Sequence, residues 1–372
     1  MSFKQIIKKI HLRLGFISGI IVTFLGITGC ILAFQHEIER ITNPYQFVEV
    51  QENPVLKPSK LQEIAVQALP EKHIHGISYH EPGKAIVATF YSEDYYYLVY
   101  LNPYSGEVLK VKDMGRDFFR IIVNGHFYLW LPPHIGQPIV ASATLIFVII
   151  LITGIILWWP RNSRFSRQNF SFKWIRAERL NIDLHRVLGF YASWILIFIT
   201  FTGLVWGFQW FAKSTYWITS GGKQLTEFYM PTVDSIPEQK PVIPAIDVLW
   251  QRMTKEYPSA KVLEVHIPEN DSSAIEVAAN PDDKTYWKAD YRYFDQYTLN
   301  EIEVTHIYGK LDSTTVADKI ARMNYDIHVG AIAGLAGKIL AFCASLIAAS
   351  LPVTGFFIWR NRKKRQQRPL FQ

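Results

Sequence analysis

Long, uninterrupted runs of apolar residues dominate the pattern of this chain. Four runs contain no Asp, Glu, Lys or Arg, and each has at least 21 residues: Leu14–Phe34, Ile139–Trp159, Val187–Trp210 and Ile339–Trp359. At a rise of about 1.5 Å per residue, a helix of this length crosses a hydrocarbon core of about 30 Å. The pattern therefore predicts an α-helical membrane protein whose four spans form a bundle.

Shorter patterns fill the two long segments between the spans. Residues 57–70 and 243–258 have apolar positions at helical spacing. Each is followed by short stretches in which β-branched and aromatic residues alternate with polar ones, with turn residues between them. We therefore expect two small α+β modules outside the membrane, which serve as packing or substrate-binding platforms.

The distribution of basic residues predicts the orientation. The chain has 39 Lys and Arg against 32 Asp and Glu, a net charge of +7. The basic residues cluster before the first span, between the second and third spans, and after the fourth, whereas the two long segments hold most of the acids. By the positive-inside rule, both ends of the chain are cytoplasmic, in a multi-pass protein of the bacterial inner membrane. The positive charge thus indicates contact with membrane lipid and not with nucleic acid.

These patterns give eight expected regions: a cytoplasmic stub and first span (1–36), a first extracytoplasmic module (37–125), an edge helix and second span (126–160), a basic cytoplasmic connector (161–184), a third span (185–210), a second extracytoplasmic module (211–325), an edge helix and fourth span (326–360), and a basic tail (361–372).

The two halves of the chain resemble each other. Residues 11–36 align without a gap on residues 185–210, with 10 of 26 positions identical. The second and fourth spans share a Thr-Gly pair near their ends, and these pairs follow His126 and His328 at nearly equal spacings. The sequence therefore predicts a duplicated span–module–span unit whose two copies run in the same direction.

Four of the 11 histidines occupy matching positions in these halves. His11 matches His185, and His126 approximately matches His328. A single histidine at a membrane surface is usually a hydrogen-bonded interfacial residue. Two equivalent histidines at the same depth are what a bis-imidazole metal centre requires, and iron accepts such ligands. His134 is an alternative to His126, and metal capture by His73 and His75 is a separate alternative.

A planar cofactor between helices also needs space beside its ligands, and glycines provide it. The candidate packing glycines are Gly15, Gly189, Gly29 and Gly203. The two cysteines, Cys30 and Cys343, lie in predicted spans, and the chain has no CxxCH motif for covalent haem attachment. Ligation by histidine would therefore hold two b-type haems, one near each membrane face. Residues 27–30, Ile-Thr-Gly-Cys, also resemble a lipoprotein cleavage box, an alternative that would remove the first span.

Several stretches resemble the PepSY-associated transmembrane family, iron-regulated membrane proteins that include siderophore-iron reductases. They are "IHLRLGF", "DLHRVLGFYASW", "DIHVGAIAGLAGKIL", the "TG…WWPR" end of the second span and "TGFFIWRNRKKR". "YLNPYSGEVLKV" and "YFDQYTLNEIEV" resemble the closing strands of PepSY modules. The resemblance implies a haem at His11 and His185, a second haem at His126 and His328, and electron transfer to extracytoplasmic ferric siderophores.

The expected function is therefore a haem-dependent membrane reductase of a ferric siderophore or another Fe(III) chelate. No GxGxxG motif is present, so the electron donor would be quinol or a separate cytoplasmic reductase. Aromatic residues outside the membrane would stack on the chelator or fill strand cores: Tyr95, Tyr96, Tyr97, Trp287, Tyr291 and Tyr293. The alternatives are a non-enzymatic scaffold or protease regulator, and a transporter subunit, which the absence of ionisable residues within the spans disfavours.

Overall fold

The computed structural model describes residues 1–159, 177–233, 235–237 and 242–367. Residues 161–176 of the expected basic connector therefore lie outside the described part. The chain forms two compact units. The helical unit comprises Met1–Gln35, Ile122–Thr215 and Asn324–Gln372, and the sheet unit comprises His36–Ile121 and Tyr216–Met323.

Four membrane-spanning helices are confirmed in the helical unit. Two are single helices, α1 (Phe3–Ala33) and α5 (Pro133–Trp158). The third combines α7 (Ala177–Asp183), a π-helical turn (Leu184–Leu188) and α8 (Gly189–Gly207). The fourth is α13 (Gly334–Gln366), and all four are long and apolar enough to cross a membrane. The shorter helices α4 (Phe118–Tyr128), α12 (Asn324–His328) and η5 (Ala331–Ala333) lie next to α5 and α13 along the chain.

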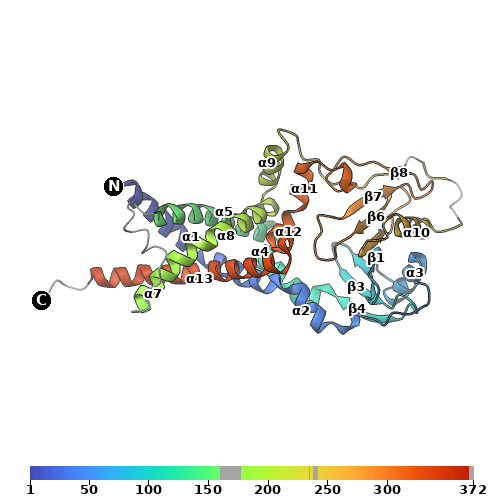
Figure 1. The fold of residues 1–372 in the computed structure, drawn as a ribbon, viewed down its shortest axis with the longest axis horizontal. Coiled ribbons are helices and arrows are strands. Elements are labelled where there is room, and N and C mark those ends of the chain that lie inside the picture. Colours follow the sequence, from blue (N-terminus) through green and yellow to red (C-terminus); the bar gives the residue numbers. More distant parts are fainter. Residues whose placement is uncertain (160–176, 234, 238–241, 368–372) are drawn as a thin grey trace. The chain divides into compact units, whose positions relative to one another are not determined.

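Small residues allow the long helices to approach closely. α1 and α8 each pack against both α5 and α13. A Cβ atom added to Gly26 would lie 2.8 Å from the backbone nitrogen of Ala349, and one added to Gly19 would lie 3.1 Å from Pro352. Association of helices in lipid depends on such close backbone contact. Lipid tails are as apolar as the helix side chains, so the hydrophobic effect does not drive the helices together. The start of α1 and the end of α13 lie at the same end of this bundle (Figure 1).

The described residues of the sheet unit form eight strands. The first four are β1 (Ile74–His80), β2 (Ile86–Tyr91), β3 (Tyr96–Leu101) and β4 (Val108–Asp113). The others are β5 (Val262–His266), β6 (Ile275–Asn280), β7 (Asp290–Phe294) and β8 (Glu301–Ile302). The helices are α2 (Gln35–Thr42), η1 (Pro44–Gln46), α3 (Pro58–Ala68), η2 (Met114–Arg116), α9 (Gln209–Thr219, which continues into the helical unit), α10 (Ala245–Glu256), η4 (Leu311–Ser313) and α11 (Val316–Arg322).

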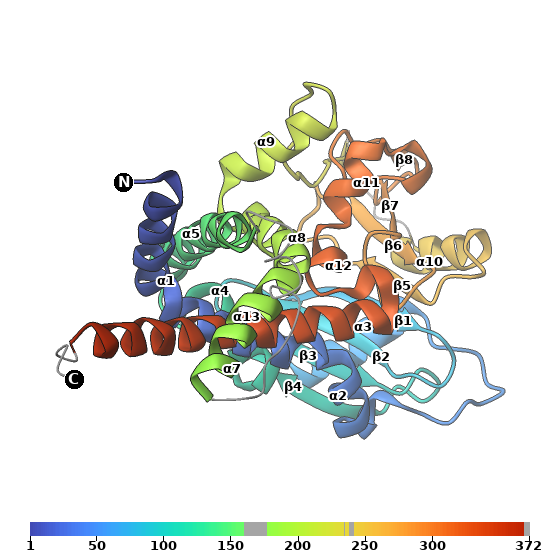
Figure 2. The same cartoon turned by 60° about the vertical axis from the view of Figure 1, so that its left-hand side comes forward.

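The strands form one antiparallel sheet and not the two separate modules expected from the sequence. Their order is β4-β3-β2-β1-β5-β6-β7-β8, which Figure 2 shows across the sheet. The two halves are joined by β1 and β5, with Ile77 opposite Val265. Each half has a helix followed by four strands, as a duplicated module would have, although the duplication itself stays a prediction. Joining the halves removes two exposed strand edges.

The core of the sheet unit lies between the sheet and the helices α3 and α10. It includes Leu61 of α3, Leu249 of α10 and Val265 of β5, none of which is exposed. Among the expected chelator-stacking residues, Tyr95 and Tyr97 pack against this core, and Tyr293 is 1% exposed. Packing therefore accounts for three of the six aromatic residues.

Candidate functional site

The first histidine pair, His11 and His185, joins α1 to the third membrane-spanning helix. The centroids of the two rings are 6.4 Å apart, and the ring planes are perpendicular. His185 lies in the π-helical turn Leu184–Leu188. Such turns re-aim side chains and are frequent at functional sites. The buried carboxylate of Asp183 pairs with Arg179 and Arg186 and so ties the residues on both sides of His185 together.

The second histidine pair consists of His126 on α4 and His328 on α12. The ring centroids are 6.2 Å apart, with an interplanar angle of 72°. His134, the alternative from the sequence, lies in the first turn of α5 with an exposed side chain. The structure therefore brings together the two pairs of histidines that the repeat had matched.

A threonine hydroxyl lies next to Nδ1 of each of the four imidazoles. Each threonine belongs to a different helix from its histidine. The distances from Oγ1 to Nδ1 are 2.9 Å for Thr153 and His11, 2.8 Å for Thr28 and His126, 2.8 Å for Thr354 and His185, and 3.0 Å for Thr202 and His328.

The threonine hydroxyls also determine which histidine nitrogen carries the proton. Each hydroxyl donates to a carbonyl oxygen one turn earlier in its own helix, as Thr28 does to Phe24 and Thr153 to Ile149. Thr202 and Thr354 do the same. Because a hydroxyl has one proton, a hydroxyl that donates to such a carbonyl can only accept from the imidazole, an arrangement that requires the imidazole proton on Nδ1. Nε2, which has no hydrogen-bond partner among the described residues, keeps the lone pair that binds metals.

A glycine follows each of these threonines and faces the same imidazole. A Cβ added at Gly154 would lie 3.4 Å from Cε1 of His11, and one at Gly355 would lie 3.3 Å from Cε1 of His185. The corresponding distances are 3.7 Å between Gly29 and His126 and 3.3 Å between Gly203 and His328. A Cβ at Gly203 or Gly355 would press on the ring, whereas one at Gly29 would make an ordinary contact.

The sequence predicted two of the four glycines that lie beside the histidine rings. Gly29 and Gly203 were expected to line the site, and both face a histidine of the second pair. An added Cβ at Gly15 would meet nothing within 4 Å, and Gly189 contacts Leu351, so neither faces an imidazole in the described structure. The four threonines, Gly154 and Gly355 were not identified as site residues. The Thr-Gly pair that is present in every span could have identified them.

The two pairs lie near opposite ends of the bundle. Thr28, the partner of His126, lies on the same helix as His11 and about five turns beyond it. Thr202, the partner of His328, has the same spacing from His185. At about 1.5 Å per residue, the two levels are separated by roughly 26 Å along the helices. This is close to the thickness of a hydrocarbon core.

The ring separations suit one metal ion between the imidazoles of each pair. A metal–imidazole bond is about 2.0 Å long, and the ring centre lies roughly 1 Å beyond the nitrogen, so two opposed rings have centroids about 6 Å apart. No group of three or more His, Cys, Asp or Glu side chains in the described residues could hold a metal ion. A metal bound by a pair must therefore bring its other ligands with it, as the iron of a porphyrin does.

A separate group of histidines lies in the sheet unit. The rings of His75 and His266 are 4.7 Å apart, and Nε2 of His266 lies 3.5 Å from Glu264 and 3.8 Å from Glu276. Burial and the neighbouring His266 lower the pKa of His75, while burial raises the pKa of Glu276. His75 thus contacts His266 in place of the expected His73. The described residues contain no metal-holding group of three here.

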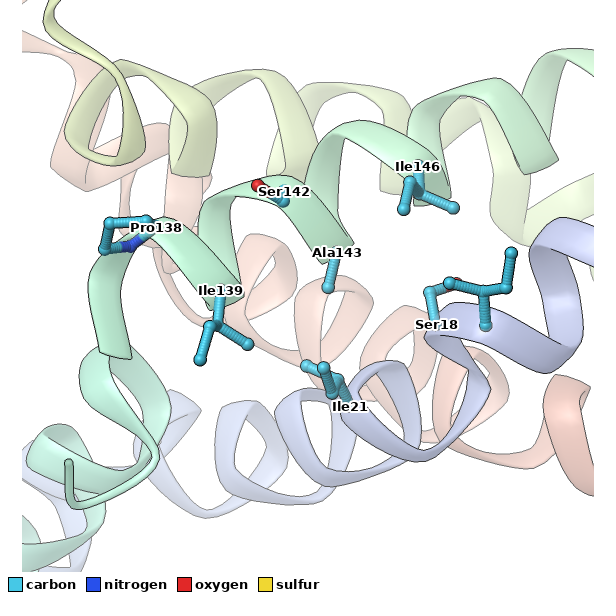
Figure 3. A pocket seen from close by; sticks show the side chains of 8 residues that line it. Ser18, Ile21, Pro138, Ile139, Ser142, Ala143 and Ile146 are labelled. Carbon is cyan, nitrogen blue, oxygen red and sulfur yellow. The ribbon is translucent and has the colours of Figure 1, made fainter. Parts of the chain in front are cut away.

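A cavity of about 360 Å³ lies between α1 and α5. Figure 3 shows Ile21 of α1 and Ile139 and Ala143 of α5 beside this space. Its remaining lining residues are Ile17, Ser18, Pro138, Ser142 and Ile146. Residues 17–21 lie between His11 and Thr28 on α1, so the cavity is at the middle level of the bundle. The lining has no titratable side chain and is suited to apolar groups.

Comparison with known proteins agrees with the resemblance seen in the motifs. A search of curated proteins finds no match to this chain. A family model described as the PepSY-associated TM region matches residues 8–362, which include all four spans and both histidine pairs. The chain therefore belongs to the PepSY-associated transmembrane family.

Proposed function

We propose that this chain is a membrane oxidoreductase that holds two b-type haems. It would pass electrons across the membrane to a ferric siderophore or another Fe(III) chelate. The observation that carries the proposal is the presence of two imidazole pairs, with ring centroids 6.4 and 6.2 Å apart, near opposite ends of one four-helix bundle. Both ends of the chain would be cytoplasmic and the sheet unit extracytoplasmic, in the inner membrane of a bacterium, as the basic residues indicate.

The residues of the two pairs fit this cofactor. His11 and His185 would hold one haem on the cytoplasmic side, and His126 and His328 would hold the other on the opposite side. A bound haem supplies reversible one-electron Fe(III)/Fe(II) chemistry. The protein holds Nδ1 of each ligand with a threonine and keeps a glycine beside each ring. The absence of a CxxCH motif leaves these noncovalent contacts to retain the group.

The overall reaction would add one electron to a chelated Fe(III) ion and release Fe(II) and the free chelator. Hard oxygen ligands bind Fe(II) more weakly than Fe(III), because the reduced ion carries less charge. The electron would come from quinol or from a cytoplasmic reductase, since the chain has no GxGxxG motif for a nucleotide.

A visible spectrum of the purified chain from haem-replete cells tests the proposal. We expect a Soret band and, on reduction with dithionite, split α and β bands. If the spectrum lacks these bands, the oxidoreductase proposal is wrong, and a scaffold without a redox cofactor becomes the better account. Reoxidation of the reduced protein by a ferric hydroxamate, followed with an Fe(II)-specific dye, then tests the substrate class.

Two neighbouring histidines provide a matched comparison. His126→Ala should remove about half of the haem, because it deletes one of the two histidines that would hold the second haem. His134→Ala should leave the haem content unchanged, because that side chain is exposed and His328 faces His126. The opposite result would assign His134 as the ligand and contradict the pairing.

A further inference from the structure

The four threonines beside the histidines do more than fill space in the bundle. We propose that Thr28, Thr153, Thr202 and Thr354 are positioning residues that hold each imidazole with Nδ1 protonated and Nε2 free for iron, and that His126 depends on its threonine far more than His328 does. The inference deepens the proposed function and rests on it for the identity of the metal.

The first step is the direction of the hydrogen bonds. Thr28 donates its proton to the carbonyl oxygens of Phe24 and Leu25, at 3.0 and 3.1 Å. Its oxygen is then left to accept from Nδ1 of His126, at 2.8 Å. The other three threonines repeat this arrangement with their own helices. Valine has nearly the same shape as threonine but cannot accept this bond, so Thr→Val isolates the acceptor.

The second step is a difference among the four sites. Nδ1 of His328 has a second acceptor, the carbonyl oxygen of Ile199, at 3.0 Å. The carbonyls of Ile150 and Leu351 lie beside the rings of His11 and His185. Each of these carbonyls belongs to the residue three positions before the respective threonine.

The corresponding carbonyl in α1, that of Leu25, makes no such contact with His126. Among the described residues, Thr28 is the hydrogen-bond partner of the His126 ring. Removing its oxygen leaves this imidazole free to rotate or to change its tautomer, whereas His328 retains a carbonyl acceptor. The two histidines of the second pair are therefore supported unequally.

The third step is the effect on a bound metal. A partner that accepts from Nδ1 orients the ring and makes Nε2 a stronger electron donor, and loss of such a partner commonly weakens metal binding by about 10–100-fold. A weaker donor stabilises Fe(II) relative to Fe(III). Loss of the Thr28 acceptor should therefore weaken haem retention and shift the reduction potential of the second haem to a more positive value.

The test uses the full-length chain with Thr28→Val, Thr28→Ser and Thr202→Val. Haem transfer to apomyoglobin, redox titration and low-temperature electron paramagnetic resonance would be measured for each. For Thr28→Val we expect haem loss about 10–100-fold faster, a positive shift of one of two potentials, and altered g values of one haem. Thr28→Ser should restore all three, and Thr202→Val should show the smaller effect. Equal behaviour of Thr28→Val and Thr202→Val, or a wild-type potential in Thr28→Val, would overturn the inference.

A measurement without haem separates this inference from the proposed function. In the apo protein labelled with ¹⁵N-histidine, the His126 resonance, identified through its absence in His126→Ala, should report a protonated Nδ1. It should change to the other tautomer or to a mixture in Thr28→Val. A wild-type protein that has this signal but never binds haem would contradict the proposed function alone. A wild-type His126 with a protonated Nε2 would contradict the inference alone.

Discussion

The histidines of the helical unit and those of the sheet unit have different polar partners. In the helical unit, each of the four paired histidines meets a neutral threonine hydroxyl and a glycine. In the sheet unit, His266 lies 3.5 and 3.8 Å from the carboxylates of Glu264 and Glu276, and its neighbour is another histidine. The two environments prepare the same side chain for different chemistry.

A hydroxyl that accepts from Nδ1 leaves the lone pair of Nε2 for a metal. The carboxylates of Glu264 and Glu276 lie at ion-pair distance from Nε2 of His266, the nitrogen that has no hydrogen-bond partner in the four paired histidines among the described residues. The partner of a histidine, and not its burial alone, therefore indicates its role. If this holds, substitutions in the sheet unit should leave the histidine pairs of the helical unit unaffected.

The largest expected effect is loss of one complete metal centre. His11→Ala, His185→Ala and the double variant should each retain about half of the wild-type haem, because two axial ligands act as one unit and their removal is not additive. The haem-to-protein ratio, measured by pyridine haemochrome assay, checks this. His75→Ala in the sheet unit is the control and should retain all of the haem. A double variant with much less haem than either single variant would contradict the assigned pairing.

A smaller effect is expected from crowding the second pair. A Cβ at Gly203 would lie 3.3 Å from the His328 ring, which is tight, whereas one at Gly29 would lie an ordinary 3.7 Å from His126. Gly203→Ala should therefore weaken haem retention, at a cost of roughly 1–3 kcal/mol, and Gly29→Ala should be tolerated. Alanine favours a helix over glycine, so helix propensity cannot cause the loss. Haem transfer rates compare the two, and equal rates would argue against contact at Gly203.

A change in the sheet unit should affect its stability and leave the haem spectrum intact. The buried carboxylate of Asp247 on α10 accepts from the backbone nitrogen and Oγ of Ser59 on α3, at 2.8 and 2.7 Å. Asp247→Ala should destabilise this unit by about 1–3 kcal/mol, because two donors lose their acceptor. Hydrogen exchange in α3 and α10 would measure the loss, and Asp247→Asn, which keeps one acceptor oxygen, should lose less. Loss of haem in Asp247→Ala would show that the two units are not separable.

The smallest effect concerns pH. Burial, aided by Lys84, lowers the pKa of His80 on β1 to about 4. The unfolded chain takes up a proton below about pH 6.5, and the folded chain does so only near pH 4. The contribution of His80 to stability is therefore complete above pH 6.5 and is lost as the pH falls towards 4.

Because the His80 ring is partly exposed, we expect a loss on the order of 1 kcal/mol between pH 7 and pH 5. Urea titrations at these two pH values, followed by hydrogen exchange of β1, would measure it. His80→Gln should reduce the difference between them. A pH dependence that is unchanged in this variant would assign the effect to other groups.

The four membrane spans were predictable because length and hydropathy are local properties of the chain. A run of about 20 apolar residues has few alternatives to a membrane helix. The strand β1 was not predicted, since three of its seven residues are histidine or glycine and its pairing shifts register between Ile74 and Gly76. The irregularity between Ile74 and Gly76 interrupts the alternation of buried and exposed positions by which a strand is recognised in a sequence.

The histidine pairs were predictable because the repeat aligned positions that are distant in the sequence, such as His11 and His185. The threonines were visible in each span but could not be assigned to a histidine. Which helix face meets which ring depends on the rotation and depth of neighbouring helices, as the bonds from Thr153 to His11 and from Thr28 to His126 illustrate. A side chain shifted by one position on a helix turns by about 100° and would miss its partner.

The amino-acid sequence alone specified the four apolar helices, the family and the identity of the four paired histidines. Only contacts in the folded chain established that the strands form one sheet through β1 and β5, and that a threonine and a glycine from another helix meet each imidazole. The difference lies in the range of the interactions. Hydropathy acts along neighbouring residues, whereas strand pairing and the orientation of a histidine ring depend on contacts between residues far apart in the chain, such as Thr28 and His126.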